Sequence, residues 1–130
     1  MALNPRILIM DDEEMLLHTL KLIFPVSGFD IETALDGEEA IKLYQKAQEE
    51  KRPFSAAILD LNVPAGAMGG AAAAREIKKI APQAKLIATS GDSFDEVMQN
   101  YKNYGFCATV VKPYEIEEIK QLLKEVIDGK

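Results

Sequence analysis

Short apolar runs alternate with longer amphipathic stretches along the whole chain, and this alternation constrains the fold more than any other feature. Five apolar runs predict β-strands, over residues 7–10, 31–34, 56–59, 86–89 and 106–111. Strands that are apolar throughout are typical of a parallel sheet that has helices on both faces and right-handed crossovers. The sequence therefore predicts an α/β fold, a doubly wound five-stranded parallel sheet with five helices.

Each predicted strand is followed by a stretch in which apolar residues recur at helical spacing. The five expected helices cover about residues 16–23, 40–47, 71–80, 94–104 and 116–126. Gly105 is a typical C-terminal cap residue for the fourth helix. A capping box places an N-cap oxygen three residues before a carboxylate, and two such pairs predict helix starts, Asp36 with Glu39 and Ser93 with Glu96.

The chain has the size and composition of one domain. Its 130 residues are 48% hydrophobic and 28% charged, and no linker or internal repeat interrupts them, so we expect a single domain over residues 1–130. The lone Cys107 permits no internal disulfide and favours a reducing compartment, so a cytoplasmic location is expected. No apolar run is long enough to span a membrane, and the N-terminal run meets acid at Asp11, too early for a signal peptide.

The charge balance excludes some partners. A net charge of −6 at pH 7 argues against a surface that neutralises the phosphates of nucleic acids or of anionic lipids. We therefore expect that this chain binds neither nucleic acid nor a membrane.

Polar residues follow four of the five predicted strands, at the edge of the sheet where open α/β folds bind ligands. They are the acidic run 11–14, Asp60, Ser90 with Gly91, and Lys112 with Pro113. Polar residues often end strands, and an alternative role for Asp11 or Asp12 is to cap the first helix. The combination of three acids, a hydroxyl and a lysine at one edge favours a functional site over that reading.

Three neighbouring carboxylates repel one another unless a cation is present, and hard oxygen ligands suit Mg²⁺. Because Mg²⁺ commonly uses only one or two carboxylates, Asp60 remains free to act as a nucleophile and to accept a phosphoryl group as an acyl phosphate. Charge on the transferring group is then stabilised by Lys112, by the Ser90 hydroxyl and by backbone N–H groups.

Four segments of the chain resemble a known family, the receiver domains of response regulators in bacterial two-component signalling. These segments stand in the family's order and at its usual spacing, and they are Arg6 to Glu14, Asp60 to Pro64, Ala88 to Gly91 and Val110 to Tyr114. The resemblance implies a flavodoxin-like sheet with strand order 2-1-3-4-5. The chain is similar in particular to receivers attached to hybrid sensor histidine kinases.

The resemblance implies a role for each residue of the predicted site. Asp60 is then the phosphoacceptor, and Asp12, Asp60 and the Asn62 carbonyl ligate Mg²⁺, while Asp11 acts mostly through water. Lys112 pairs with the phosphate, and the peptide bond between Lys112 and Pro113 is cis. Ser90 carries the hydroxyl that swings inward when the phosphoryl group arrives. Two further positions, Leu61 and Gly91, are expected to be cofactor-binding.

Some residues depart from the family pattern or invite other interpretations. The aromatic residue that many receivers carry three positions before the lysine is here Thr109, and the segment from Ala65 to Ala74 is unusually rich in alanine. His18 is expected to be an exposed, solvated histidine with no part in phosphoryl transfer. The phosphohistidine that donates the phosphoryl group is therefore expected on the partner protein. Four methionines are expected to fill gaps in the core, namely Met10, Met15, Met68 and Met98.

The predicted function is a phosphorylation-dependent switch that receives its phosphoryl group from a histidine kinase or a histidine phosphotransfer domain. It is expected to catalyse only its own phosphoryl transfer and dephosphorylation, and a phosphorylation-dependent homodimer is among the expected partners. Three alternatives remain open: a Mg²⁺-dependent aspartyl-phosphate phosphatase, a flavin-binding module and a degenerate receiver that only docks partners. The sequence also leaves open whether the chain acts alone or belongs to a larger kinase or regulator.

Overall fold

The computed structural model describes residues 4–129 and has one five-stranded parallel sheet. The order across the sheet is β2-β1-β3-β4-β5, which confirms the predicted class and strand order. The strands are β1 (Arg6–Met10), β2 (Asp30–Ala34), β3 (Ala56–Asp60), β4 (Leu86–Ser90) and β5 (Ala108–Val111).

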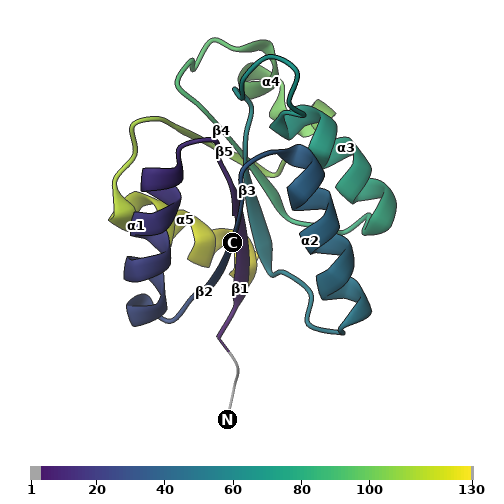
Figure 1. Cartoon of the computed structure of the whole chain (residues 1–130). Coiled ribbons are helices and arrows are strands. Elements are labelled where there is room, and N and C mark those ends of the chain that lie inside the picture. The colour runs from purple at the N-terminus through teal and green to yellow at the C-terminus, as the bar shows by residue number, and fades with distance from the viewer. Residues whose placement is uncertain (1–3, 130) are drawn as a thin grey trace.

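Helices cover both faces of the sheet, α1 and α5 on one face and α2 and α3 on the other (Figure 1). The α-helices are α1 (Glu14–Ile23), α2 (Gly37–Glu49), α3 (Gly70–Ile80), α4 (Glu96–Gln99) and α5 (Ile116–Asp128). Two short 3-10 helices follow α1 and α4, namely η1 (Phe24–Ser27) and η2 (Tyr101–Tyr104). In the part of the chain that the structure describes, no helix combines the length and the apolar character needed to cross a membrane.

The core has two halves because alternate strand residues point to opposite faces. Ile7 and Ile9 of β1 pack with the apolar sides of α1 and α5, whereas Leu8 and Met10 pack with α2 and α3. Each fully buried aliphatic side chain of this kind contributes about 1.5–3 kcal/mol relative to an exposed one. Burial on both faces explains why the strands read as continuous apolar runs.

The capping box predicted at the start of α2 is confirmed. The Asp36 side chain accepts the Glu39 N–H (3.0 Å), and the Glu39 carboxylate in turn accepts the Leu35 N–H (2.8 Å). Both bonds satisfy N–H groups that have no partner inside the helix.

The capping box predicted at Ser93 is wrong. The N-cap of α4 is Asp95, whose carboxylate accepts the Val97 N–H (2.9 Å). Just before it, the Asp92 carboxylate accepts the Phe94 N–H (2.9 Å), so two Asx turns precede the helix. A carboxylate is a stronger acceptor than a serine hydroxyl, and this moves the helix start past Ser93.

The predicted fourth helix is also shorter and less regular than expected. α4 ends at Gln99, and Asn100 leaves the helical conformation (φ −122°, ψ 40°) before η2 begins. Gly105 then adopts φ +91° and caps η2, which confirms its predicted role as a cap residue. The segment therefore forms two short turns rather than one helix over 94–104.

β5 begins at Ala108 rather than at residue 106 as predicted. The Phe106 N–H bonds back to the Tyr101 carbonyl (3.1 Å), which closes the turn after η2 and places the Phe106 ring in the core. Cys107 follows the turn and is exposed. The apolar run over residues 106–111 includes residues of this turn as well as of β5, and for this reason it predicted a strand longer than the observed one.

The alanine-rich segment divides between the loop after β3 and the first turns of α3. Ala73 and Ala74 are fully buried against the sheet, so their small side chains let α3 pack closely. Gly70 opens the helix, where an added Cβ would lie 2.7 Å from the Asp60 carbonyl oxygen. Alanine at 73 and 74 and glycine at 70 thus bring the start of α3 against the end of β3.

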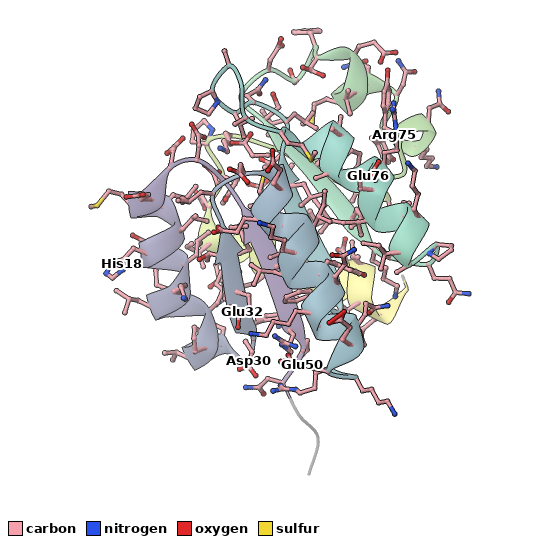
Figure 2. The ribbon with its side chains drawn as sticks, turned by 45° about the vertical axis from the view of Figure 1, so that its right-hand side comes forward. His18, Asp30, Glu32, Glu50, Arg75 and Glu76 are labelled. Atoms are coloured by element: carbon pink, nitrogen blue, oxygen red, sulfur yellow. The ribbon has the colours of Figure 1, made fainter. Side chains whose placement is uncertain are left out.

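Two predictions concern side chains on α1. His18 is exposed and points away from the sheet, as Figure 2 shows. Met15 is 80% exposed, so the prediction that it fills the core is wrong, because α1 turns only Leu17 and Leu20 fully inward. Met10 and Met98 are buried as predicted, and Met68 is half-buried.

Candidate functional site

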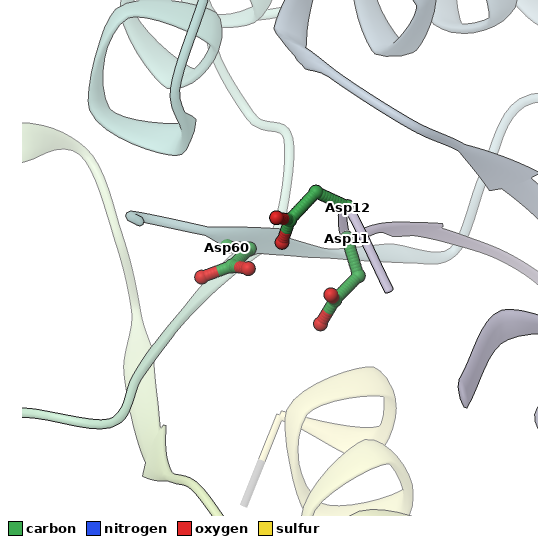
Figure 3. Close-up of side chains that lie close together, drawn as sticks. All are labelled: Asp11, Asp12 and Asp60. Carbon is green, nitrogen blue, oxygen red and sulfur yellow. The ribbon is translucent and has the colours of Figure 1, made fainter. Parts of the chain in front are cut away.

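Three carboxylates meet at the carboxyl ends of β1 and β3. Oxygens of Asp11, Asp12 and Asp60 all lie within 4.8 Å of one another (Figure 3). Asp11 and Asp60 are each 1% exposed, whereas Asp12 is exposed to solvent. The two strands are neighbours in the sheet, and this brings together acids that are far apart in the sequence.

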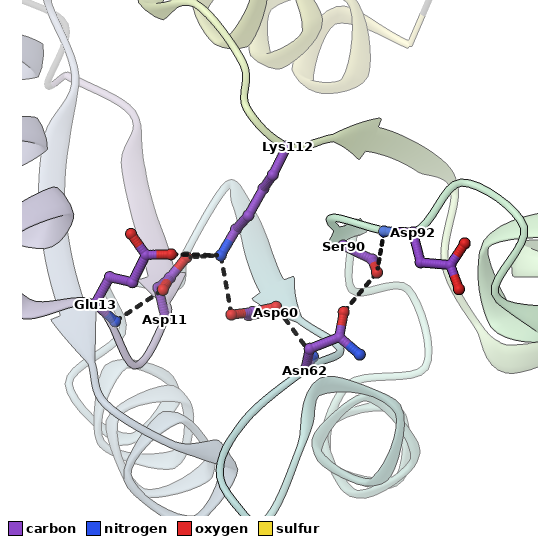
Figure 4. Close-up of polar contacts among 7 residues, drawn as sticks. All are labelled: Asp11, Glu13, Asp60, Asn62, Ser90, Asp92 and Lys112. Atoms are coloured by element: carbon purple, nitrogen blue, oxygen red, sulfur yellow. Dashed lines mark hydrogen bonds and ion pairs between the residues drawn. The ribbon is translucent and has the colours of Figure 1, made fainter.

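Lys112, the residue after β5, reaches across the sheet edge to these acids (Figure 4). Its Nζ lies 2.5 Å from Asp11 Oδ2, 3.0 Å from Asp60 Oδ2 and 3.8 Å from Glu13 Oε1. Burial acts to lower the pKa of Lys112, but the bonds to Asp11 and Asp60 outweigh it and raise this pKa above its ordinary value. The Lys112 ammonium is therefore a constant positive charge at the site. The peptide bond between Lys112 and Pro113 is cis, as expected.

The Asp60 carboxylate is held at both oxygens. Oδ1 accepts the Asn62 N–H (3.0 Å), and Oδ2 accepts a hydrogen bond from Lys112 (3.0 Å). Burial raises the pKa of Asp60 above its usual value, and these two partners offset only part of that rise. A buried carboxylate of this kind attracts a cation or an electrophile more strongly than one in water does.

Ser90 ends β4 and is fully buried. Its hydroxyl donates to Asn62 Oδ1 (2.5 Å) and accepts the Asp92 N–H (3.0 Å). Asn62 thus touches both Asp60, through its main chain, and Ser90, through its side chain. The sequence placed Asn62 beside the acids but gave no sign of this second contact.

A cleft of about 610 Å³ opens above the carboxylates. Predicted site residues that line it include Asp12, Asp60, Asn62, Gly91 and Lys112. Leu61 does not line the cleft, and its N–H instead bonds to the Thr89 carbonyl (2.9 Å), which extends the pairing of β3 with β4.

Four further residues line this cleft, namely Glu13, Leu16, Pro113 and Tyr114. The sequence placed Glu13 and Pro113 at this edge without giving them a role, and it did not predict Leu16 or Tyr114 as cleft residues. Burial, and then the charge of Asp11, raise the pKa of Tyr114 to about 12. All four residues follow the end of β1 or β5 within a few positions. This closeness to a strand end is the sequence feature that could have identified them as cleft residues.

The arrangement suits chemistry on an anionic group. A buried carboxylate faces a cleft, a lysine supplies a positive charge beside it, and the neighbouring acids offer oxygens to a divalent cation.

Comparisons with known proteins agree with this geometry. A family model described as the response regulator receiver domain matches residues 7–124. The chain is 28% identical over 127 residues to the alkaline phosphatase synthesis transcriptional regulatory protein PhoP of Bacillus subtilis, covering 96% of this chain and 49% of that protein. It is 26% identical over 125 residues to the chemotaxis protein CheY of Thermotoga maritima, covering 95% and 98%.

A solved structure of the CheX–CheY complex from Borrelia burgdorferi with BeF₃ and Mg²⁺ also resembles the chain. The TM-score is 0.84 at 26% identity, and the match covers 98% of this chain and 92% of that chain. The chain spans about half the length of the Bacillus relative and nearly the full length of the Thermotoga one.

Proposed function

The chain belongs to the response regulator receiver domain family, and on that premise we propose that it accepts a phosphoryl group on Asp60 from a phosphohistidine of a partner protein. The observation that carries the proposal is the setting of Asp60. It is 1% exposed, faces the cleft, and is bonded by Lys112 at one oxygen and by a backbone N–H at the other. This combination suits a nucleophile better than a structural carboxylate.

The proposed phosphoryl transfer conserves atoms and charge. An Asp60 oxygen forms a bond to phosphorus, the P–N bond of the phosphohistidine breaks, and the imidazole leaves with that electron pair and takes up a proton. The product is an acyl phosphate. The Lys112 ammonium, 3.0 Å from Asp60, stabilises the negative charge on the oxygens of the transferring group.

The donor set of the site fits Mg²⁺. Asp11, Asp12 and Asp60 offer only carboxylate oxygens, and the cleft leaves space for the waters that Mg²⁺ retains. Asp12, Asp60 and the Asn62 carbonyl are the residues that would hold the ion directly, with Asp11 acting through water. When bound, it supplies positive charge that lowers the repulsion between the acids and an incoming phosphate.

The proposed output is a conformational switch that a partner reads through protein contact. The acyl phosphate presents new acceptor oxygens near Ser90, and a bond from the Ser90 hydroxyl would favour one conformation of the loop before α4. The Gly91 backbone leaves room for that movement, because an added Cβ there would meet nothing within 4 Å. Dimerisation on phosphorylation and a cytoplasmic location stay predictions.

Intact mass measured after incubation with acetyl phosphate tests the proposal. We expect one added phosphoryl group, which requires Mg²⁺ and which disappears in Asp60→Asn. The matched control is Asp92→Asn, because Asp92 is an exposed acid near the site that bonds only the main chain of its own loop through its side chain. If rapid quenching shows no added mass in the wild-type protein, the proposal that Asp60 accepts a phosphoryl group is contradicted.

A further inference from the structure

The Ser90 hydroxyl is bonded away from the phosphoacceptor in this structure. It is fully buried, donates to Asn62 Oδ1 (2.5 Å) and accepts from the Asp92 N–H (3.0 Å), as Figure 4 shows. Within residues 4–129, the structure has no hydrogen bond between Ser90 and Asp60. The resting hydroxyl is thus satisfied by two partners that belong to the loops after β3 and β4.

A serine hydroxyl carries a single proton and so donates to one acceptor at a time. Donation to Asn62 Oδ1 and donation to a phosphoryl oxygen on Asp60 therefore exclude each other. The bond from the Asp92 N–H is different, because it uses a lone pair and leaves the proton free. Only the Asn62 bond has to break before Ser90 can respond to phosphorylation.

We propose that Asn62 holds the Ser90 hydroxyl in its resting position and thereby opposes the phosphorylated conformation. The inference rests on the proposed function and adds a regulatory role for one residue of the same site. Asn62 is suited to this role because its N–H binds Asp60 Oδ1 (3.0 Å) while its side chain binds Ser90. These two hydrogen bonds fix the position of Asn62 relative to both Asp60 and Ser90.

The expected size of the effect follows from the kind of bond. One neutral side-chain hydrogen bond changes an equilibrium by about two- to tenfold. The Asn62 side chain is exposed, so water competes for Ser90 when the amide is removed, and we expect the lower half of this range.

The test is a double-mutant cycle with beryllofluoride and Mg²⁺ as the phosphoryl analogue. Affinity is measured for the wild-type protein, Asn62→Ala, Ser90→Ala and the double variant. We expect Asn62→Ala to tighten binding about two- to fivefold when Ser90 is present and to have no effect in the Ser90→Ala background. Asp92→Ala is the matched control, because its contact with Ser90 is made by the main chain and survives the substitution.

A second measurement needs no analogue. The amide resonances of Gly91 to Phe94 in unliganded Asn62→Ala should move part of the way toward their positions in the beryllofluoride-bound wild-type protein. The proposal is overturned if these resonances stay in place, or if Asn62→Ala alters affinity equally in both backgrounds. Failure of the wild-type protein to bind beryllofluoride contradicts the proposed function instead, so the two failures are distinguishable.

Discussion

Thr89 and Ser90 are adjacent buried hydroxyls on β4, yet their bonding differs. Successive strand residues point to opposite faces, so Ser90 reaches the loops at the site while Thr89 points to the other face. Ser90 has a donor and an acceptor partner, whereas the Thr89 Oγ1 is buried with no hydrogen-bond partner in the described chain. A buried hydroxyl without a partner loses its hydration without compensation, so Thr89 lowers the stability of the fold.

Thr89→Val should therefore raise the free energy of unfolding by about 1 kcal/mol, because a methyl group of similar shape replaces the unpaired hydroxyl. Urea unfolding of the two proteins measures this difference. Thr89→Ser is the control, since it keeps a hydroxyl and removes a buried methyl, and it should lower stability by about 1 kcal/mol. A valine variant no more stable than the wild-type protein would show that the hydroxyl has a partner in solution.

At the scale of elements, the starts of α2 and α4 show why one sequence signal succeeded and the other failed. Both segments have a capping-box pattern, but Asp36 is an acid with no competing acceptor beside it, whereas Ser93 lies between Asp92 and Asp95. The two acids form their own turns and displace the serine. A pattern of residue types identifies candidate caps, and the competition between neighbouring acceptors decides among them.

This contrast predicts different costs for two substitutions. Asp36→Ala should lower the free energy of unfolding by about 1 kcal/mol, because the Glu39 N–H loses its partner at the start of a long helix. Ser93→Ala should change stability by less than about 0.5 kcal/mol, since the Ser93 hydroxyl caps nothing. Thermal or urea unfolding of both variants gives the comparison, and equal losses would contradict the observed cap of α4.

At the scale of the whole molecule, the sequence predicted the sheet and thereby the meeting of Asp11, Asp60 and Lys112. Each of these residues lies at or just after a strand end, and in a parallel sheet such positions share one edge. The bond from Ser90 to Asn62 was not predictable in the same way. It depends on the side-chain rotamers and on the path of two loops, and residue spacing carries no information about either.

The same edge concentrates negative charge in a chain whose net charge is −6. Burial raises the pKa of Asp60 in the folded state, so the folded protein loses stability as pH rises from the ordinary aspartate pKa through this raised value. That cost is fully present once the pH exceeds the raised pKa of Asp60. A cation bound between the carboxylates offsets it, because it binds the folded state and has no assembled site in the unfolded chain.

Mg²⁺ should therefore raise the unfolding midpoint at pH 7, with a gain of about 2.7 kcal/mol at a hundredfold excess over its dissociation constant. Asp12→Asn should abolish most of this gain, and a chelator should reverse it in the wild-type protein. Glu38→Gln removes one exposed charge on α2 and serves as the control. Equal gains in all three proteins would mean that Mg²⁺ only screens the overall charge.

Gly70 and Gly91 show that the two sides of Asp60 are packed differently. An added Cβ at Gly70 would lie 2.7 Å from the main chain of Asp60, whereas one at Gly91 would meet nothing within 4 Å. The start of α3 therefore packs directly against the end of β3, with no space for a side chain between them. The start of the β4–α4 loop borders open space instead, so a side chain fits at Gly91 but not at Gly70.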